Sequence, residues 1–140
     1  MSDSFKILLI EDNPMDVALI QEMLKLAQAK DAEGPVYEFC HAKSLAAAEP
    51  YWKSSLDLVL LDLSLPDSQG IATFMRVEAL AGEAPIVVLS GLSDDNIALE
   101  AVRAGAQDYL VKWQMGSRTL SKVLRYAVER KKAEKDRFVS

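Results

Sequence analysis

Cysteine and histidine are nearly missing from this chain of 140 residues, which contains only Cys40 and His41 of these two types. A lone cysteine cannot close a disulfide within the chain, which is typical of proteins from a reducing compartment. One residue of each type also cannot supply the several cysteine and histidine ligands of a zinc site. We interpret Cys40 as a small apolar residue of a strand, and we assign His41 no role beyond packing.

Long apolar runs are absent too, since no stretch of the sequence approaches the roughly 20 residues that span a bilayer. The first residues also lack the basic and apolar regions of a secretory signal. These two absences predict a protein of the cytoplasm without a membrane partner.

Glycine-rich phosphate loops are missing as well. Neither Gly-x-Gly-x-x-Gly nor Gly-x4-Gly-Lys-Ser/Thr follows the first apolar run, which counts against a nucleotide- or flavin-binding domain.

Charge is unevenly spread: residues 117–140 carry a net charge of +5, and residues 1–116 carry −10. An acidic body argues against direct nucleic-acid binding, because such binding depends on neutralising phosphates.

What the chain does contain is a set of short apolar runs, each ending in a polar residue. Runs of this length are typical of strands that are buried on both faces of a parallel sheet. Because the carboxyl ends of parallel strands meet at one edge, these polar residues should lie close together. The runs are Phe5–Ile10 before Glu11-Asp12, Leu58–Leu61 before Asp62, Ile86–Leu89 before Ser90, and Tyr109–Val111 before Lys112.

Helical segments alternate strictly with these runs, which predicts one α/β domain: a doubly wound, five-stranded parallel sheet with helices on both faces. Asn13-Pro14 and Ser44 are helix-start signals, and Pro50 indicates an irregular helix end. The predicted strands are residues 5–10, 36–41, 57–61, 86–89 and 108–111. The predicted helices are 14–30, 44–52, a third ending at Ala81, one capped by Ser93 that ends near Gly105, and one capped by Ser117.

The composition changes at Glu129, where an almost wholly charged segment begins that contains neither glycine nor proline. We therefore assign residues 1–128 to the domain and residues 129–140 to a charged helical extension or linker. A helix that outruns its domain is typical of a coiled-coil homodimer or of a connection to a fused output domain. A frayed polar tail remains the simpler alternative.

The residues at the strand ends form a plausible phosphoryl site. A carboxylate such as Asp62 can accept a phosphoryl group from an activated donor, and the chain then mainly positions groups and neutralises charge. Crowded carboxylates repel one another, and a divalent cation relieves that repulsion. Mg²⁺ suits such a site because it prefers oxygen ligands and retains several waters.

Four motifs stand at these strand ends: Glu11-Asp12-Asn13, Leu60–Asp67, Ser90-Gly91 and Gly105–Lys112. In this order they resemble the receiver domain of two-component response regulators, over about residues 5–128. The resemblance implies a flavodoxin-like (βα)5 fold with an extended last helix. It also implies a phosphorelay partner, either a histidine kinase or a phosphotransfer protein.

The resemblance assigns roles to individual residues. Asp62 would be the phosphoacceptor, assisted by Lys112 and by the hydroxyl of Ser90. Ser90 and Tyr109 would switch the face made by the fourth helix, fifth strand and fifth helix. Mg²⁺ would be held by Glu11 through water, Asp12, Asp62 and the backbone carbonyl of Ser64.

One residue departs from the family pattern: Trp113 follows the lysine where proline is common, so the geometry of the loop over residues 112–116 is open. Two alternatives remain beside an active receiver. A degenerate receiver would act as an unphosphorylated interaction module. An aspartate-nucleophile phosphatase would need a second carboxylate two residues after Asp62, where Ser64 stands. We expect a signalling module and not an enzyme.

Overall fold

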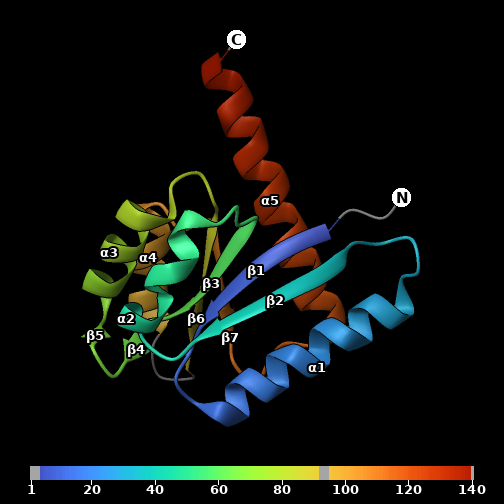
Figure 1. Ribbon diagram of the computed structural model, residues 1–140, viewed down its shortest axis with the longest axis horizontal. Coiled ribbons are helices and arrows are strands. Elements are labelled where there is room, and N and C mark those ends of the chain that lie inside the picture. The colour runs from blue at the N-terminus through green and yellow to red at the C-terminus, as the bar shows by residue number, and fades with distance from the viewer. Residues whose placement is uncertain (1–3, 92–94, 140) are drawn as a thin grey trace.

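The computed structural model describes residues 4–91 and 95–139 and contains a five-stranded parallel sheet with the strand order β2-β1-β3-β6-β7 (Figure 1). The predicted fold class is confirmed. Each predicted strand is present within one or two residues of its expected bounds. The strands are β1 Ser4–Ile10, β2 Val36–Ala42, β3 Leu58–Asp62, β6 Ile86–Ser90 and β7 Asp108–Val111.

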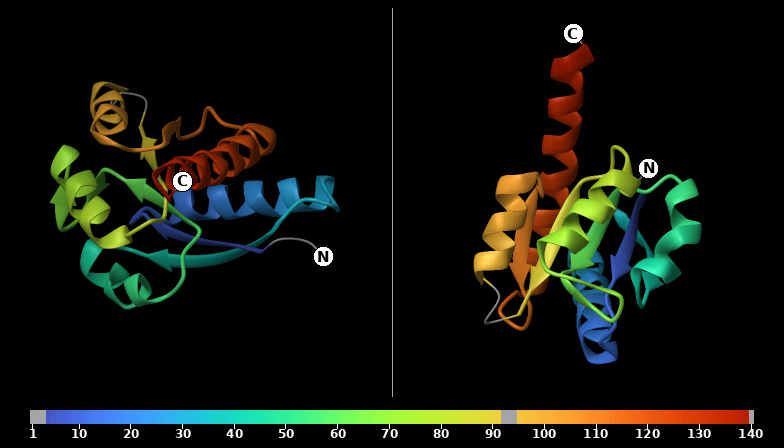
Figure 2. Two further views of the ribbon diagram at one scale, coloured as in Figure 1. Left: turned by 90° about the horizontal axis from the view of Figure 1, so that it is seen from above. Right: turned by 90° about the vertical axis from the view of Figure 1, so that its left-hand side faces the viewer.

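Helices cover both faces of this sheet (Figures 1 and 2). Apolar side chains alternate along the strands, so that Ile7 and Leu9 pack toward one helical layer and Leu8 and Ile10 toward the other. Helices α1 and α5 form the first layer, and α2, α3 and α4 form the second. The helices are α1 Pro14–Lys30, α2 Leu45–Ala48 with the 3₁₀ turn η1 Glu49–Lys53, α3 Ile71–Ala81, α4 Asp95–Ala104 and α5 Ser117–Val139.

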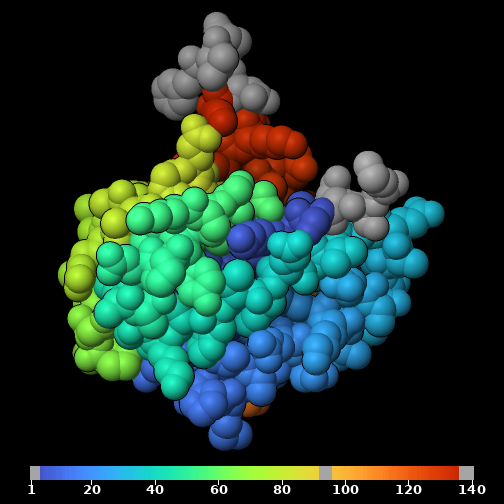
Figure 3. Space-filling model, in the orientation of Figure 1, coloured from blue at the N-terminus to red at the C-terminus, as the bar shows by residue number. Residues whose placement is uncertain are grey.

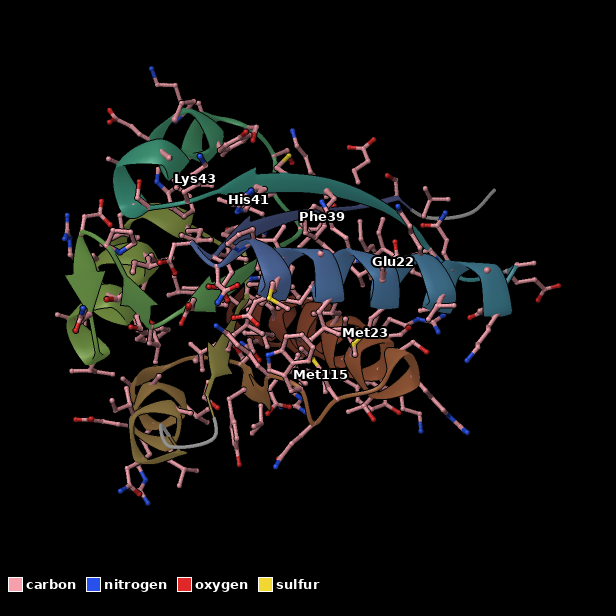
Figure 4. The ribbon with its side chains drawn as sticks, turned by 90° about the horizontal axis from the view of Figure 1, so that it is seen from below. Glu22, Met23, Phe39, His41, Lys43 and Met115 are labelled. Atoms are coloured by element: carbon pink, nitrogen blue, oxygen red, sulfur yellow. The ribbon has the colours of Figure 1, made fainter. Side chains whose placement is uncertain are left out.

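Methionine fills part of the contact between the two helices of the first layer. Met115 is buried just before α5, and the partly buried Met23 of α1 packs against the same core (Figure 4). The flexible thioether side chain suits an irregular gap of this kind.

The predicted helix starts at Asn13 and Ser44 are confirmed by side-chain caps. Asn13 Oδ1 accepts hydrogen bonds from two backbone N–H groups of the first turn of α1, and Ser44 Oγ accepts one from Ala47 N at 3.0 Å. A second cap on α2 comes from Asp67, whose two carboxylate oxygens each lie 3.1 Å from a backbone nitrogen. The hydrogen bond from Leu45 N contributes most to lowering the pKa of Asp67.

Two local predictions differ from the structure. The segment after β3 was expected to be a loop, but it forms a small antiparallel hairpin of β4 Ser64–Leu65 and β5 Ser68–Gln69. Ser117 was expected to cap the last helix, but it is the first residue of α5. The predicted cap at Ser93 lies outside the described residues. Pro50 does mark an irregular end, because α2 passes into the 3₁₀ turn at Glu49.

Helix α5 continues without a break through the charged segment and extends beyond the edge of the sheet at which β1 begins (Figures 1 and 3). The first turns of this segment contact the domain: Arg130 donates to the backbone oxygen of Gln107, and Lys135 pairs with Glu83 at 2.7 Å. A groove of about 910 Å³ lies between the segment and the starts of β1, β3 and β6. Within the described ranges, no helix is long and apolar enough to cross a membrane.

Candidate functional site

Three carboxylates meet at the opposite edge of the sheet, where the strands end. Glu11 and Asp12 directly follow β1, and Asp62 is the last residue of β3. One oxygen atom from each residue lies within 4.8 Å of the others. Glu11 and Asp62 are buried, whereas Asp12 is exposed. The sequence-based prediction that these side chains come together is therefore confirmed.

The backbone around these carboxylates is tightly held. Glu11 N donates to Ala42 O at 3.0 Å, and His41 Nε2 lies 2.7 Å from Glu11 O. Because a carbonyl oxygen only accepts, the His41 ring donates this hydrogen bond, a contact that sequence reasoning missed. Ser64 N donates to Asp62 Oδ1 at 3.0 Å, which places Ser64 beside the central carboxylate. The proposed role of the Ser64 carbonyl as a ligand stays a prediction.

Lys112 lies among the acidic side chains. Its Nζ atom is 2.5 Å from Glu11 Oε1, 2.9 Å from Asp16 Oδ2 and 3.1 Å from Asp62 Oδ2. Burial alone would lower the pKa of Lys112, but its hydrogen bonds to Glu11 and Asp16 and the nearby negative charges outweigh burial and raise it. The ammonium group therefore stays positively charged at neutral pH.

Glu11 is the most strongly perturbed acid of the cluster. Its side chain is 0 % exposed, and burial, followed by the hydrogen bond to Asp62, raises its pKa from the ordinary 4.5 to about 8 in spite of Lys112. Oε1 is fully buried and, within residues 4–91 and 95–139, has no hydrogen bond of regular geometry beyond its ion pair with Lys112. The three carboxylates offer only oxygen donors close together, and this donor set fits a hard divalent metal.

Asp16 and Trp113 also belong to the site. Sequence reasoning did not find Asp16, and it singled out Trp113 only as a departure from the family pattern. Asp16 lies in the first turn of α1, and its Oδ1 accepts a hydrogen bond from Trp113 Nε1 at 2.9 Å. Trp113 has a φ of 67°, a left-handed conformation that bulky residues rarely adopt, and all peptide bonds in the described ranges are trans. The loop after β7 therefore passes through a left-handed residue at the position that departs from the family pattern.

Ser90 and Tyr109 lie on the two strands beyond β3. Ser90 is buried at the end of β6, and its hydroxyl donates to Leu110 O at 3.5 Å. In the sheet register, Leu89 is opposite Asp62, so Ser90 stands one residue further along the neighbouring strand. Tyr109 is half-buried on β7 and packs against the core beneath α3 and α4. The switching roles of both residues stay predictions.

Comparison with known proteins identifies one family. Residues 7–125 match the response regulator receiver domain. The chain is 28% identical to the chemotaxis protein CheY of Bacillus subtilis over 108 residues, which cover 77% of this chain and 88% of CheY. It is 31% identical to the transcriptional regulatory protein ZraR of Escherichia coli K12 over 111 residues, which cover 79% of this chain but 23% of ZraR.

Solved structures show the same fold at low sequence identity. A response regulator receiver domain protein from Clostridium thermocellum has a TM-score of 0.75 and 23% identity, with coverage of 92% of this chain and 98% of that one. The receiver domain of the sensor histidine kinase PA1611 of Pseudomonas aeruginosa, which has a magnesium ion coordinated in its active site cleft, has a TM-score of 0.70 and 23% identity, with coverage of 90% and 98%. The fold, the acidic edge and the match over residues 7–125 lead to one conclusion: this chain belongs to the receiver domain family of two-component response regulators.

Proposed function

We propose that this chain is a phosphoacceptor module in which Asp62 takes a phosphoryl group from a histidine kinase or a phosphotransfer protein. The observation that carries this proposal is the environment of the Asp62 carboxylate. It is buried at a strand end, with Lys112 Nζ 3.1 Å from one oxygen and the backbone nitrogen of Ser64 3.0 Å from the other. The ammonium group of Lys112 and the N–H dipole of Ser64 would stabilise the negative charge of an incoming phosphoryl group.

Magnesium would be the resident metal of this site. Asp12, Asp62 and the backbone carbonyl of Ser64 would hold the ion, with Glu11 acting through water. The fit rests on the all-oxygen donor set, in which one oxygen of each carboxylate lies within 4.8 Å of the others. When bound, the metal supplies positive charge that offsets the charge of the phosphoryl oxygens.

The side chains of this protein perform the transfer. A carboxylate oxygen of Asp62 forms a bond to phosphorus while the bond from phosphorus to the donor nitrogen breaks, and the donor imidazole leaves as the neutral group after protonation. Lys112 follows the carboxylate to the new phosphoryl oxygens as a mobile point charge. Ser90 exchanges its long contact with Leu110 O for one of those oxygens.

Phosphorylation of Asp62 would then shift the surface formed by α4, β7 and α5 between two states. The movement of Ser90 leaves space that the half-buried Tyr109 can fill. The added charge of about −1.5 to −2 favours the state in which Ser90 and Lys112 contact the phosphoryl oxygens. The size of the population shift is limited by the difference in contact free energy between the two states. A binding partner would bind one state of this surface more tightly than the other.

The proposal predicts one phosphoryl adduct when the chain is incubated with acetyl phosphate and Mg²⁺. Intact-mass spectrometry should show a single added group that is absent in EDTA and in Asp62→Asn. A matched control is Asp57→Asn, which changes the aspartate just before β3, far from the site, whose side chain accepts a hydrogen bond from Lys6 N; this variant should be modified like the wild type. No adduct despite bound Mg²⁺ would instead favour a degenerate receiver.

We further propose that the chain does not act as a turnover enzyme. Ser64 occupies the position where an aspartate-nucleophile phosphatase needs its second carboxylate, and it is an exposed residue of the β4–β5 hairpin. Release of the alcohol from a generic phosphate ester should not exceed about one equivalent per chain, because the phosphoryl group would stay on Asp62. Sustained turnover well beyond one equivalent would restore the phosphatase alternative.

The extension of α5 is proposed to be a protein contact, either with a fused output domain or with the same helix of a second chain. The first arrangement is compatible with the length of ZraR: the matched region covers only 23% of that protein, so most of ZraR lies outside it. The extension is continuously helical to Val139 and projects from the domain, which suits helix pairing (Figure 2).

Pairing of this kind predicts a concentration-dependent dimer. Static light scattering should show a molar mass that rises toward two chains, and acetyl phosphate with Mg²⁺ should move the midpoint of this transition. A monomer at every concentration, with and without the phosphoryl donor, would rule out the homodimer and leave the output-domain connection.

A further inference from the structure

One buried carboxylate at the site is outside both the proposed acceptor and the proposed metal ligands. Asp16 is 5 % exposed, and both of its oxygens are used. Oδ2 lies 2.9 Å from Lys112 Nζ, and Oδ1 accepts from Trp113 Nε1 at 2.9 Å. Its backbone nitrogen donates to Asn13 Oδ1 at 3.3 Å, so the first turn of α1 fixes its position.

Asp16 differs from the other partners of Lys112 in one respect. The cluster of oxygens that could share a metal ion contains Glu11, Asp12 and Asp62 but not Asp16. A divalent cation in that cluster would take up the charge of two of the three carboxylates that now contact Lys112. Asp16 is then the anion that keeps the ammonium group beside Asp62.

The hydrogen bond from Trp113 Nε1 connects Asp16 to Lys112 by a second route, through the backbone. Trp113 follows Lys112 directly, has a left-handed backbone and is 57 % exposed as a residue. Lys112 N donates to Ser90 O at 2.9 Å on one side of this residue, and Gln114 N donates to Val111 O at 3.3 Å on the other. The indole hydrogen bond ties this unusual turn, which directly follows Lys112, to α1.

We propose that Asp16 is a positioning residue for Lys112, which it holds directly at the ammonium group and indirectly through the Trp113 turn. This role rests on the proposed function, because its consequence is the rate at which Asp62 is phosphorylated. It assigns a specific task to the tryptophan that stands where related chains commonly have proline: its side chain, and not a ring in its backbone, constrains the loop.

Two variants separate the two contacts. Asp16→Asn removes the charge that faces Lys112 but keeps an oxygen that can accept from the indole. Trp113→Phe removes the indole donor but keeps the charge. With saturating acetyl phosphate and Mg²⁺, we expect the rate constant of adduct formation to fall about 10-fold in Asp16→Asn and about 3-fold in Trp113→Phe, because small misplacements of a catalytic group reduce rate strongly. Asp31→Asn, an exposed aspartate after α1 that pairs with Arg125, should leave the rate unchanged.

A spectroscopic measurement tests the contact without any phosphoryl donor. The chain has two tryptophans, so a ¹H–¹⁵N spectrum contains two indole signals, and Trp113→Phe identifies the one from Trp113. In Asp16→Ala this signal should move toward that of a solvated indole and exchange faster with water, while the signal of Trp52 stays in place. A Trp113 signal that does not respond to Asp16→Ala would overturn the proposal.

The two measurements together distinguish a positioning role from a structural one. A shifted indole signal with a wild-type rate in Asp16→Asn would overturn the positioning role, because the contact would then serve only stability. A shifted signal with the slower rate, at an unchanged half-saturating concentration of acetyl phosphate, supports it. A wild-type chain that forms no adduct while the indole signal responds would overturn the proposed function and the rate effect with it, but not the Asp16–Trp113 contact.

Discussion

Lys112→Met is expected to lower the free energy of unfolding of the metal-free protein by about 3 kcal/mol, in the range known for removing one partner of a buried ion pair. The lysine side chain is only 12 % exposed and is the cation shared by Glu11, Asp16 and Asp62. Methionine keeps the approximate length of the side chain but leaves the carboxylates to repel one another. Glu11, whose pKa is about 8, already holds its proton at neutral pH and so adds little to this repulsion.

Urea denaturation in EDTA measures this effect, with Lys122→Met as the control. Lys122 is an exposed residue of α5, and its replacement should change the free energy of unfolding by less than about 0.5 kcal/mol. Addition of Mg²⁺ should stabilise Lys112→Met more than the wild type, because the metal replaces the missing positive charge. An unchanged denaturation midpoint for Lys112→Met in EDTA would show that solvent already screens these carboxylates.

The strands and the edge at which the site lies could be predicted from the sequence because their signals are local. The segment Leu58–Leu61 is apolar throughout, and every residue of β3 is indeed buried between two helical layers. The cap pair Asn13-Pro14 likewise fixes a helix start through contacts within three residues. Parallel strands then bring their ends together by geometry alone, which is why Glu11, Asp62 and Lys112 could be grouped in advance.

Other features could not be predicted because they depend on contacts between distant segments. An acid three residues after a helix cap, such as Asp16, is indistinguishable from an ordinary favourable charge at a helix start. Its actual partners, Lys112 and Trp113, lie 96 and 97 residues away. The β4–β5 hairpin has two residues per strand, too few for an alternating pattern to appear. The double cap of Asp67 on α2 spans more than 20 residues for the same reason.

Stability in EDTA is expected to fall as the pH rises from 5 to 8, and Glu11 is the reason. Its pKa is raised by burial, and next by Asp62, from 4.5 to about 8 in the folded chain, so the folded state holds a proton that the unfolded chain has released. This contribution to stability is complete below pH 4.5 and is lost as the pH rises through about 8. The size of the loss should be about 2–4 kcal/mol, since one pKa unit corresponds to roughly 1.4 kcal/mol.

The other groups with a shifted pKa, among the residues that the structure describes, titrate outside this window. The pKa of Lys112 is raised above 10.5, so the stability linked to it is lost only in more alkaline solution. The lowered pKa of Asp67 affects stability only below about pH 4.

Denaturation at a series of pH values should therefore give a flat curve for Glu11→Gln, which has no proton to release. Glu22→Gln, an exposed change on α1, should keep the wild-type slope. Mg²⁺ should also flatten the wild-type curve, because it binds the ionised carboxylate in place of the proton. A wild-type curve in EDTA that rises between pH 5 and 8, or an equal slope in Glu11→Gln, would show that Glu11 is ionised in the folded chain at neutral pH.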